Sequence, residues 1–154
     1  MNFREIIKPN LNKLDLKGNG VKETKDYITN GYWLIRKDLL TEVEKAMIKE
    51  KASEVGELSE KSIENLLENA KRGERNYLIE DTIWLDGSTP VLKAKTQPEK
   101  YKFNAYYVAF VMNKLERAGI YDYELRTNET VWELPVLYFV DRKGNLLGAI
   151  AGRK

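Results

Sequence analysis

The sequence predicts a single α+β domain, residues 1–154, built on an antiparallel sheet. Three observations support this prediction. The expected elements follow the order helix, hairpin, helices, strands, helix and strands, without the regular alternation of a parallel sheet. The helix expected at about 104–118 is largely apolar, whereas two helices expected within 41–73 are polar and belong on the outside. A chain of 154 residues is also long enough to bury one sizeable core.

The first forty residues predict a helix, a loop and a hairpin. Apolar residues recur at helical spacing near the N-terminus, at Phe3, Ile6, Ile7, Leu11 and Leu14. Pro9 implies that this helix is short, kinked or begun afresh. A loop over 15–23 leads to the segment YITNGYWLIRK, in which Asn30 and Gly31 separate two β-prone runs. Both residues accept positive φ, so we expect a type I′ turn.

Two polar helices are expected next. Thr41 and Glu44 have the spacing of a capping box, which predicts a helix that ends at about Val55. Ser59 can cap the following helix, which ends near Gly73. Its apolar stripe consists of Ile63, Leu66, Leu67 and Ala70. A single stripe of this kind is typical of a helix packed on one side and solvated on the other.

The second half of the chain predicts strands around one apolar helix. Strands are expected at 77–84 and from 91, joined by a turn at 86–88, and later at 121–126, 134–140 and 146–150. Gly144 suits the loop between the last two strands. The helix runs from its N-cap Asn104 to Gly119. We expect its face with Val108, Ala109, Met112 and Leu115 to lie on the sheet, and its other side to contact another helix or a second subunit.

The composition excludes several chemistries. The chain has no cysteine and no histidine, which removes thiol nucleophiles, disulfides, Cys/His zinc sites and Ser-His-Asp triads. No phosphate-binding glycine motif is present, and we expect neither a cofactor nor a metal. One catalytic alternative uses carboxylates and Mg²⁺: Asp86 precedes a strand, and Glu124-Leu125-Arg126 resembles a nuclease Glu-x-Lys. Arg keeps its proton too firmly to activate water as that Lys does.

A basic strip is the main candidate binding site. Residues 91–117 hold six basic and two acidic residues, although the net charge of the whole chain is only +2. The candidate contacts to a DNA backbone are Lys93, Lys95, Lys100, Lys102, Lys114 and Arg117. The alternative is a solvated face with scattered lysines. The N-terminus has no apolar run of signal or membrane length, so we expect a cytoplasmic protein without a membrane partner.

Aromatic residues give a second candidate surface. Tyr106, Tyr107 and Phe110 of the apolar helix are candidates for binding a protein partner or a second copy of the chain. Together with Tyr27, Tyr32 and Trp33 they are also candidates for stacking on bases beside the basic strip. Aromatic residues at strand and helix spacing more often belong to a core.

One family resemblance combines several of these elements. One segment resembles the strand–turn–strand part of bacterial DNA polymerase sliding clamps: YITNGYWLI (27–35). The closing half of a clamp domain is similar to four later segments taken in order: KFNAYYVAFVMNKLERAG, YDYELR, LPVLYFV and NLLGAIAG. The resemblance covers about half of the chain. It implies a clamp-like domain of reduced size, with 41–75 as an insertion. Clamp helices line a DNA channel, which implies that Asn113, Lys114 and Arg117 face DNA.

Three hypotheses follow. The first is a non-catalytic, clamp-like binding protein of DNA replication or of its interference, encoded by a virus or mobile element, that contacts DNA backbone through the basic strip. The second is a protein-interaction or inhibitor module that uses the aromatic helix. The third is the carboxylate-metal nuclease.

Overall fold

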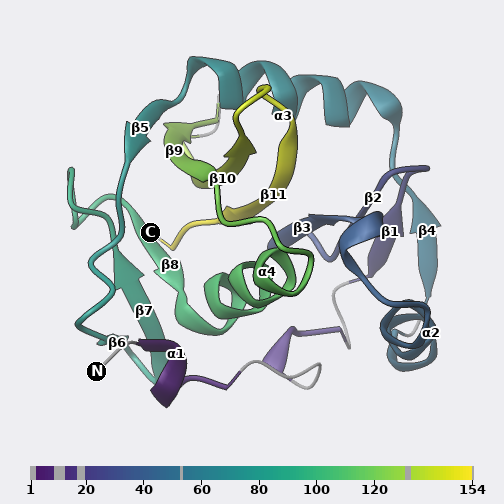
Figure 1. The fold of residues 1–154 in the computed structure, drawn as a ribbon, viewed down its shortest axis with the longest axis horizontal. Coiled ribbons are helices and arrows are strands. Elements are labelled where there is room, and N and C mark those ends of the chain that lie inside the picture. Colours follow the sequence, from purple (N-terminus) through teal and green to yellow (C-terminus); the bar gives the residue numbers. More distant parts are fainter. Residues whose placement is uncertain (1–2, 9–12, 17–19, 53, 131–132, 154) are drawn as a thin grey trace.

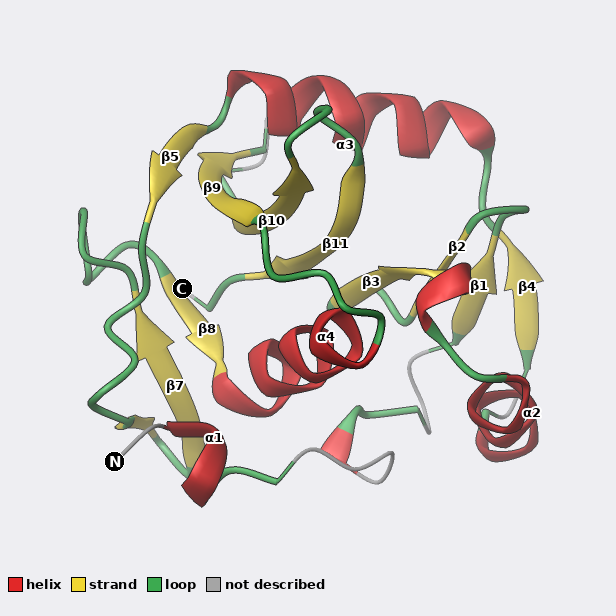
Figure 2. Cartoon of the chain, viewed as in Figure 1, coloured by secondary structure: helices red, strands yellow, loops and turns green. Residues whose placement is uncertain are grey.

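The computed structural model describes residues 3–8, 13–16, 20–52, 54–130 and 133–153. Its helices are α1 (Phe3–Ile6), α2 (Glu42–Lys51), α3 (Glu60–Arg72) and α4 (Ala105–Arg117), with a 3-10 turn η2 (Lys37–Leu39). The strands of the first half are β1 (Val21–Glu23), β2 (Tyr27–Thr29), β3 (Trp33–Arg36), β4 (Val55–Glu57) and β5 (Glu74–Asn76). Those of the second half are β6 (Trp84–Asp86), β7 (Thr89–Lys93), β8 (Lys102–Asn104), β9 (Tyr123–Glu129), β10 (Pro135–Asp141) and β11 (Leu146–Ala151). The predicted α+β class is confirmed (Figure 2).

The strands form two sheets. The larger has eight strands in the order β4-β1-β2-β3-β11-β10-β9-β5, and the smaller has three in the order β6-β7-β8. Neighbouring strands are antiparallel, as predicted, except β1 and β4, which pair in parallel. The prediction of a purely antiparallel sheet is therefore wrong at this edge. The parallel pair arises because α2 carries the chain back across the sheet before β4 begins.

The large sheet separates two apolar layers (Figure 1). One face is covered by α3, whose Ile63 and Ala70 pack with side chains of β10 and β11 such as Tyr138 and Leu146. The opposite face is covered by α4, α2, the N-terminal segment and the smaller sheet, which share the main core. As predicted, α2 and α3 are polar outer helices, each with few buried residues.

The apolar helix α4 is covered on almost every side by its own chain. The Phe110 ring lies 5.7 Å from the Trp33 ring, centroid to centroid. A Cβ added to Gly148 of β11 would lie 3.1 Å from Val111 Cγ1, which shows how closely α4 approaches the sheet. Phe3 and Leu14 of the N-terminal segment belong to the same core. The cover expected from another helix or subunit is thus supplied by the N-terminal segment and the second sheet.

The helix caps are as predicted. Thr41 and Glu44 form the reciprocal bonds of a capping box at α2. The Ser59 hydroxyl accepts a hydrogen bond from the Ser62 amide at α3, and the Asn104 side chain accepts one from the Tyr106 amide at α4. These caps satisfy amides that have no partner within the helix. α2 ends at Lys51 rather than near Val55, which begins β4.

The hairpin of β2 and β3 is present, but its turn is not type I′. Gly31 has a φ of 94°, whereas Asn30 is not among the described residues with positive φ. Asn30 is instead buried, and its Oδ1 accepts hydrogen bonds from the amides of Tyr32 and Trp33. Its Nδ2 donates to the Leu14 carbonyl at 2.7 Å. The side chain therefore links the hairpin to the N-terminal segment, a tertiary contact that turn statistics do not contain.

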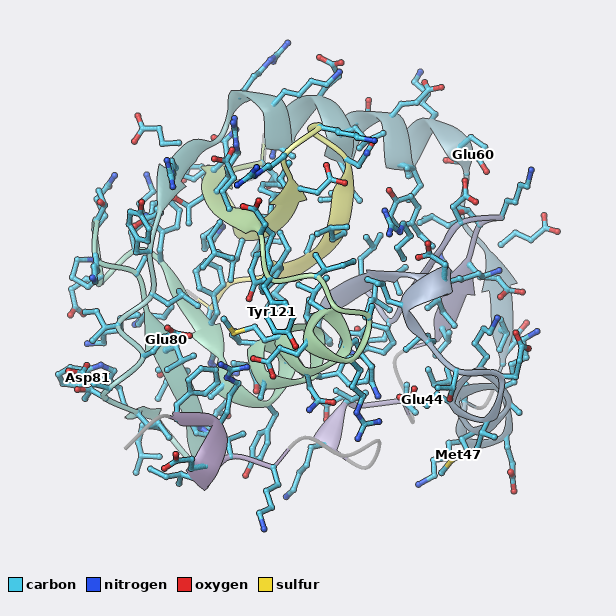
Figure 3. All side chains as sticks on the ribbon, viewed as in Figure 1. Glu44, Met47, Glu60, Glu80, Asp81 and Tyr121 are labelled. Atoms are coloured by element: carbon cyan, nitrogen blue, oxygen red, sulfur yellow. The ribbon has the colours of Figure 1, made fainter. Side chains whose placement is uncertain are left out.

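The strand expected at 77–84 is interrupted. Leu78 forms a bridge with Ala94, and Trp84 pairs with Val91, so both ends lie beside β7. The segment between them loops out, and Figure 3 shows Asp81 at the edge of the molecule. The strands expected at 134–140 and 146–150 are confirmed as β10 and β11, and the one expected at 121–126 is shifted to Tyr123–Glu129.

Part of the predicted N-terminal helix is confirmed as α1, Pro9 and Leu11 fall outside the described residues, and Leu14, which is described, does not lie in an α-helix, so the prediction is wrong there. Among the described helices, none has both the length and the apolar character needed to cross a membrane.

Candidate nucleic-acid interface

The smaller sheet has one face in the core and one face outside. On β7 and its extension, Leu92 and Ala94 are fully buried, so Lys93 and Lys95, which alternate with them, lie on the outer face. Lys102 of β8 is the cross-strand partner of Lys93 and lies on the same face. Three residues of the predicted basic strip therefore come together on one surface.

Two exposed aromatic residues share this surface. Trp84 is 41% exposed and pairs with Val91, two residues before Lys93, which places its ring on the outer face. Tyr77 is 53% exposed, and its carbonyl accepts a hydrogen bond from the Lys95 amide, so the two residues lie side by side. We call Tyr77, Trp84, Lys93, Lys95 and Lys102 the aromatic-basic face.

Each exposed ring has cations beside it. Lys93 Nζ lies 4.3 Å from the centroid of the Trp84 ring. Arg75 and Lys95 lie 5.6 and 5.7 Å from the centroid of the Tyr77 ring. Cations at such distances are attracted to the ring face, and they leave the rings partly open to solvent. Tyr77, Trp84 and Arg75 were not predicted as site residues from the sequence, although the alternation of Lys93 and Lys95 with apolar residues indicates an outer face.

Carboxylates neutralise part of the basic strip. Lys93 forms a salt bridge of 3.0 Å with Glu99, and Lys100 one of 2.9 Å with Glu129. The hydrogen bond from Lys93 lowers the pKa of Glu99, and the hydrogen bond to Glu129 raises the pKa of Lys100. The Lys100–Glu129 pair is more than a third exposed on both sides and is of the weak surface kind, whereas the Lys93 side chain is only 16% exposed. Within the described part of the chain, Lys95 and Lys102 form no salt bridge.

The other two residues of the predicted strip lie elsewhere. Lys114 is only 6% exposed and is ion-paired with Glu44 of α2, which Figure 3 shows on the side of α2 that faces α4. It cannot reach a phosphate from this position, so its assignment as a DNA contact is wrong. Arg117 is exposed at the far end of α4. The length of a helix of 13 residues, about 20 Å, separates it from the aromatic-basic face.

The aromatic residues of α4 do not form an exposed surface. Tyr107 and Phe110 are buried in the core, and Tyr106 is half-buried with Lys13 5.4 Å from its ring centroid. The expectation that Tyr107 and Phe110 bind a partner is therefore wrong, because the protein's own N-terminal segment and Trp33 occupy that side. The same burial removes Trp33 as a residue that stacks on bases.

A polar cleft of about 470 Å³ adjoins the aromatic-basic face. Its lining comes from β7, from the start of α4, from the end of β11 and the residues that follow it, and from two residues of the N-terminal half of the chain. The lining residues with polar side chains are Asp15, Tyr32, Thr89, Asn104, Tyr107 and Arg153. Arg153 links the two sites, because its amide donates to the Lys102 carbonyl at 2.9 Å.

The carboxylates proposed for metal chemistry are on different sheets. Asp86 of β6 accepts a hydrogen bond of 2.8 Å from Arg153 Nε, and Glu124 of β9 is bound to Arg126. Arg153 holds the pKa of Asp86 below its ordinary value. The described residues contain no group of three or more acidic side chains placed to share a metal ion.

Comparison with known proteins adds no relative. A scan against family models, a search of curated proteins and a search of solved structures each found no match to this chain.

Proposed function

We propose that the protein is a non-catalytic DNA-binding protein that holds single-stranded DNA on the aromatic-basic face. The observation that carries the proposal is the placement of Tyr77 and Trp84 on the same outer face as Lys93, Lys95 and Lys102. Proteins that bind single strands combine cations for the phosphates with exposed rings on which bases stack. A duplex hides its base faces, so we expect a single strand to bind more tightly than a duplex.

The proposal predicts a specific salt dependence. If Lys93, Lys95 and Lys102 each neutralise one phosphate, log Kd should change with log salt concentration with a slope of about 2 in magnitude. The measurement is fluorescence anisotropy of a labelled twelve-residue oligothymidine over a series of salt concentrations. A binding constant that does not change with salt contradicts the assigned phosphate contacts.

Two variants separate the roles of charge and stacking. Lys95→Glu reverses a cation with no salt bridge to any described residue, and it should weaken binding and flatten the salt slope. Lys61→Glu on the exposed side of α3 changes the net charge equally and serves as the control. Trp84→Ala should weaken binding by about 1–3 kcal/mol without changing the salt slope. Equal effects of the two charge reversals would argue for bulk electrostatics rather than a site.

The resemblance to sliding clamps supports the second part of the proposal, a role in DNA replication or in its interference. α4 followed by β9, β10 and β11 has the element order that the resemblance implies. Because α4 is buried, we propose that DNA contacts the sheet face rather than this helix. The mass of the protein in solution, measured with and without DNA, tests the clamp-like part of the proposal. A protein that is a monomer in both states would contradict ring formation, but it would not contradict binding of a single strand.

The non-catalytic part has its own test. Labelled single-stranded and duplex DNA incubated with the protein and Mg²⁺ or Mn²⁺ should remain full length. Cleavage that Glu124→Gln abolishes would instead support the carboxylate-metal nuclease.

A further inference from the structure

Lys93 of the aromatic-basic face has two partners within its own chain. Its Nζ lies 4.3 Å from the centroid of the Trp84 ring and 3.0 Å from Glu99 Oε1. The Lys93 side chain is only 16% exposed, whereas the Glu99 side chain is 80% exposed. The ring keeps the ammonium group at the outer face, and the exposed carboxylate is the partner that an anion arriving from solvent would have to replace.

Glu99 lies in the connection between β7 and β8, whose backbone is held by hydrogen bonds. The Lys100 amide donates to the Gln97 carbonyl at 3.0 Å. The Thr96 amide donates to Asn76 Oδ1 at 3.2 Å, and Asn76 is itself only 3% exposed. Because this backbone is already ordered, the ion pair between Lys93 and Glu99 has to order two side chains and no loop.

The carboxylate of Glu99 competes for the same ammonium group that the proposed function assigns to a phosphate. The hydrogen bond from Lys93, followed by the attraction of its charge, lowers the pKa of Glu99, so the carboxylate is charged at neutral pH. Phosphate and carboxylate oxygens both accept charge-assisted hydrogen bonds from a lysine. A strand therefore gains less from Lys93 than from a lysine without a salt bridge, because one ion pair breaks when the other forms.

We infer that Glu99 sets the affinity of the aromatic-basic face for a strand, because it occupies Lys93 until a phosphate of the strand replaces it. The inference rests on the proposed function, since the strand supplies the phosphate. Glu99 is then a residue of the binding face that acts against binding, and its removal strengthens the complex.

The first test removes the charge of the carboxylate. Glu99→Gln keeps the size of the side chain and should bind the labelled twelve-residue oligothymidine about two- to fivefold more tightly than the unchanged protein, as expected for the loss of a partly exposed ion pair. Glu57→Gln is the matched control, because it removes one negative charge from an exposed residue of β4. Figure 1 shows β4 and β7 at opposite sides of the molecule.

The outcomes of this comparison separate the inference from the proposed function. A strand that binds the unchanged protein, and binds Glu99→Gln no more tightly than Glu57→Gln, overturns the inference and leaves the strand-binding face standing. If neither the unchanged protein nor Glu99→Gln binds any oligonucleotide, the proposed function is wrong and the inference falls with it.

A double-variant cycle shows whether Glu99 acts through Lys93. In a protein with Lys93→Met, Glu99 has no ammonium group to occupy, so the further change Glu99→Gln should alter the affinity no more than Glu57→Gln does. A larger gain that persists in the Lys93→Met protein contradicts the assignment, because the carboxylate would then repel the strand directly. Thermal unfolding of each variant checks that the fold is retained.

The ion pair itself can be measured without DNA. NMR titration of the Glu99 carboxyl group should give a pKa below the ordinary value of 4.5 in the unchanged protein, and a pKa closer to 4.5 in Lys93→Met. A pKa of Glu99 that Lys93→Met does not raise contradicts the contact on which the inference depends.

Discussion

The helices α3 and α4 lie on opposite faces of the same sheet and have the same length of 13 residues, yet they are packed in opposite ways (Figure 1). In α3 the buried residues are Ile63 and Ala70, and the rest of the helix is solvated or half-buried. In α4 nearly every side chain up to Leu115 is buried. The difference shows that an apolar helix requires cover on both sides, which here comes from the sheet and from the N-terminal segment with β6–β8.

The first prediction tests this difference directly. Phe110→Ala removes a buried ring that contacts Trp33 and should lower the free energy of unfolding by about 3–5 kcal/mol. Leu67→Ala, at a half-buried position of α3, should cost clearly less. Chemical denaturation of both variants measures the two losses. Equal losses would mean that the two helices contribute alike to the core.

The second prediction concerns the buried ion pair on α4. Glu44→Gln keeps a capping-box side chain but leaves Lys114 buried without a charge partner, and should destabilise the protein by about 3 kcal/mol. Lys114→Met combined with Glu44→Gln should recover most of that loss, because no unpaired charge remains. A double variant that is less stable than Glu44→Gln alone would show that the pair itself stabilises α4.

The third prediction addresses the close approach of α4 to the sheet. A Cβ at Gly148 would lie 3.0 Å from the Leu34 carbonyl oxygen and 3.1 Å from Val111 Cγ1. Gly148→Ala should therefore cost about 1–3 kcal/mol through overpacking. Gly56→Ala is the control, since its Cβ would meet only Lys22 Cγ at 3.8 Å. If both variants unfold at the same denaturant concentration, the contact is looser than the structure indicates.

The smallest expected effect is a dependence on pH. Burial alone raises the pKa of Glu44, but the hydrogen bonds from Lys114 and Thr41 outweigh it and hold the pKa below its ordinary value of 4.5. A lowered pKa stabilises the folded state above the ordinary value, and this stability is lost as the pH falls through the lower folded value. Unfolding measured between pH 6 and pH 3 should thus depend less on pH in Glu44→Gln. A pH dependence identical to that of the unchanged protein would exclude Glu44 as a contributor.

Local features of the sequence predicted much of this fold correctly. Thr41, Ser59 and Asn104 begin their helices as expected, and Gly144 takes a φ of 83° in the last hairpin loop. Each of these signals acts within a few residues of the chain. The parallel pairing of β1 with β4 and the separate three-stranded sheet join residues far apart in sequence, so no short segment contains them.

The candidate site was predicted only in part for the same reason. The alternation around Lys93 and Lys95 was visible in the sequence, but the position of Tyr77 and Trp84 on the same face depends on the loop at 79–83. Lys114 was predicted to contact DNA because it is one of the six basic residues of 91–117, but Glu44 from another helix pairs with it and accounts for its burial. Asp15 and Arg153 meet at one cleft through tertiary packing alone.

The place of β11 in the sheet has a consequence for synthesis. β11 lies between β10 and β3, where Gly148 pairs with Ile35. A chain emerging from the ribosome exposes the β2–β3 hairpin long before the strand that completes it. Pairings over such a sequence separation form slowly, and unpaired strand edges attract other chains in the meantime. We therefore expect the N-terminal hairpin to need shielding during translation, and productive folding to start only after residues 146–151 have left the exit tunnel.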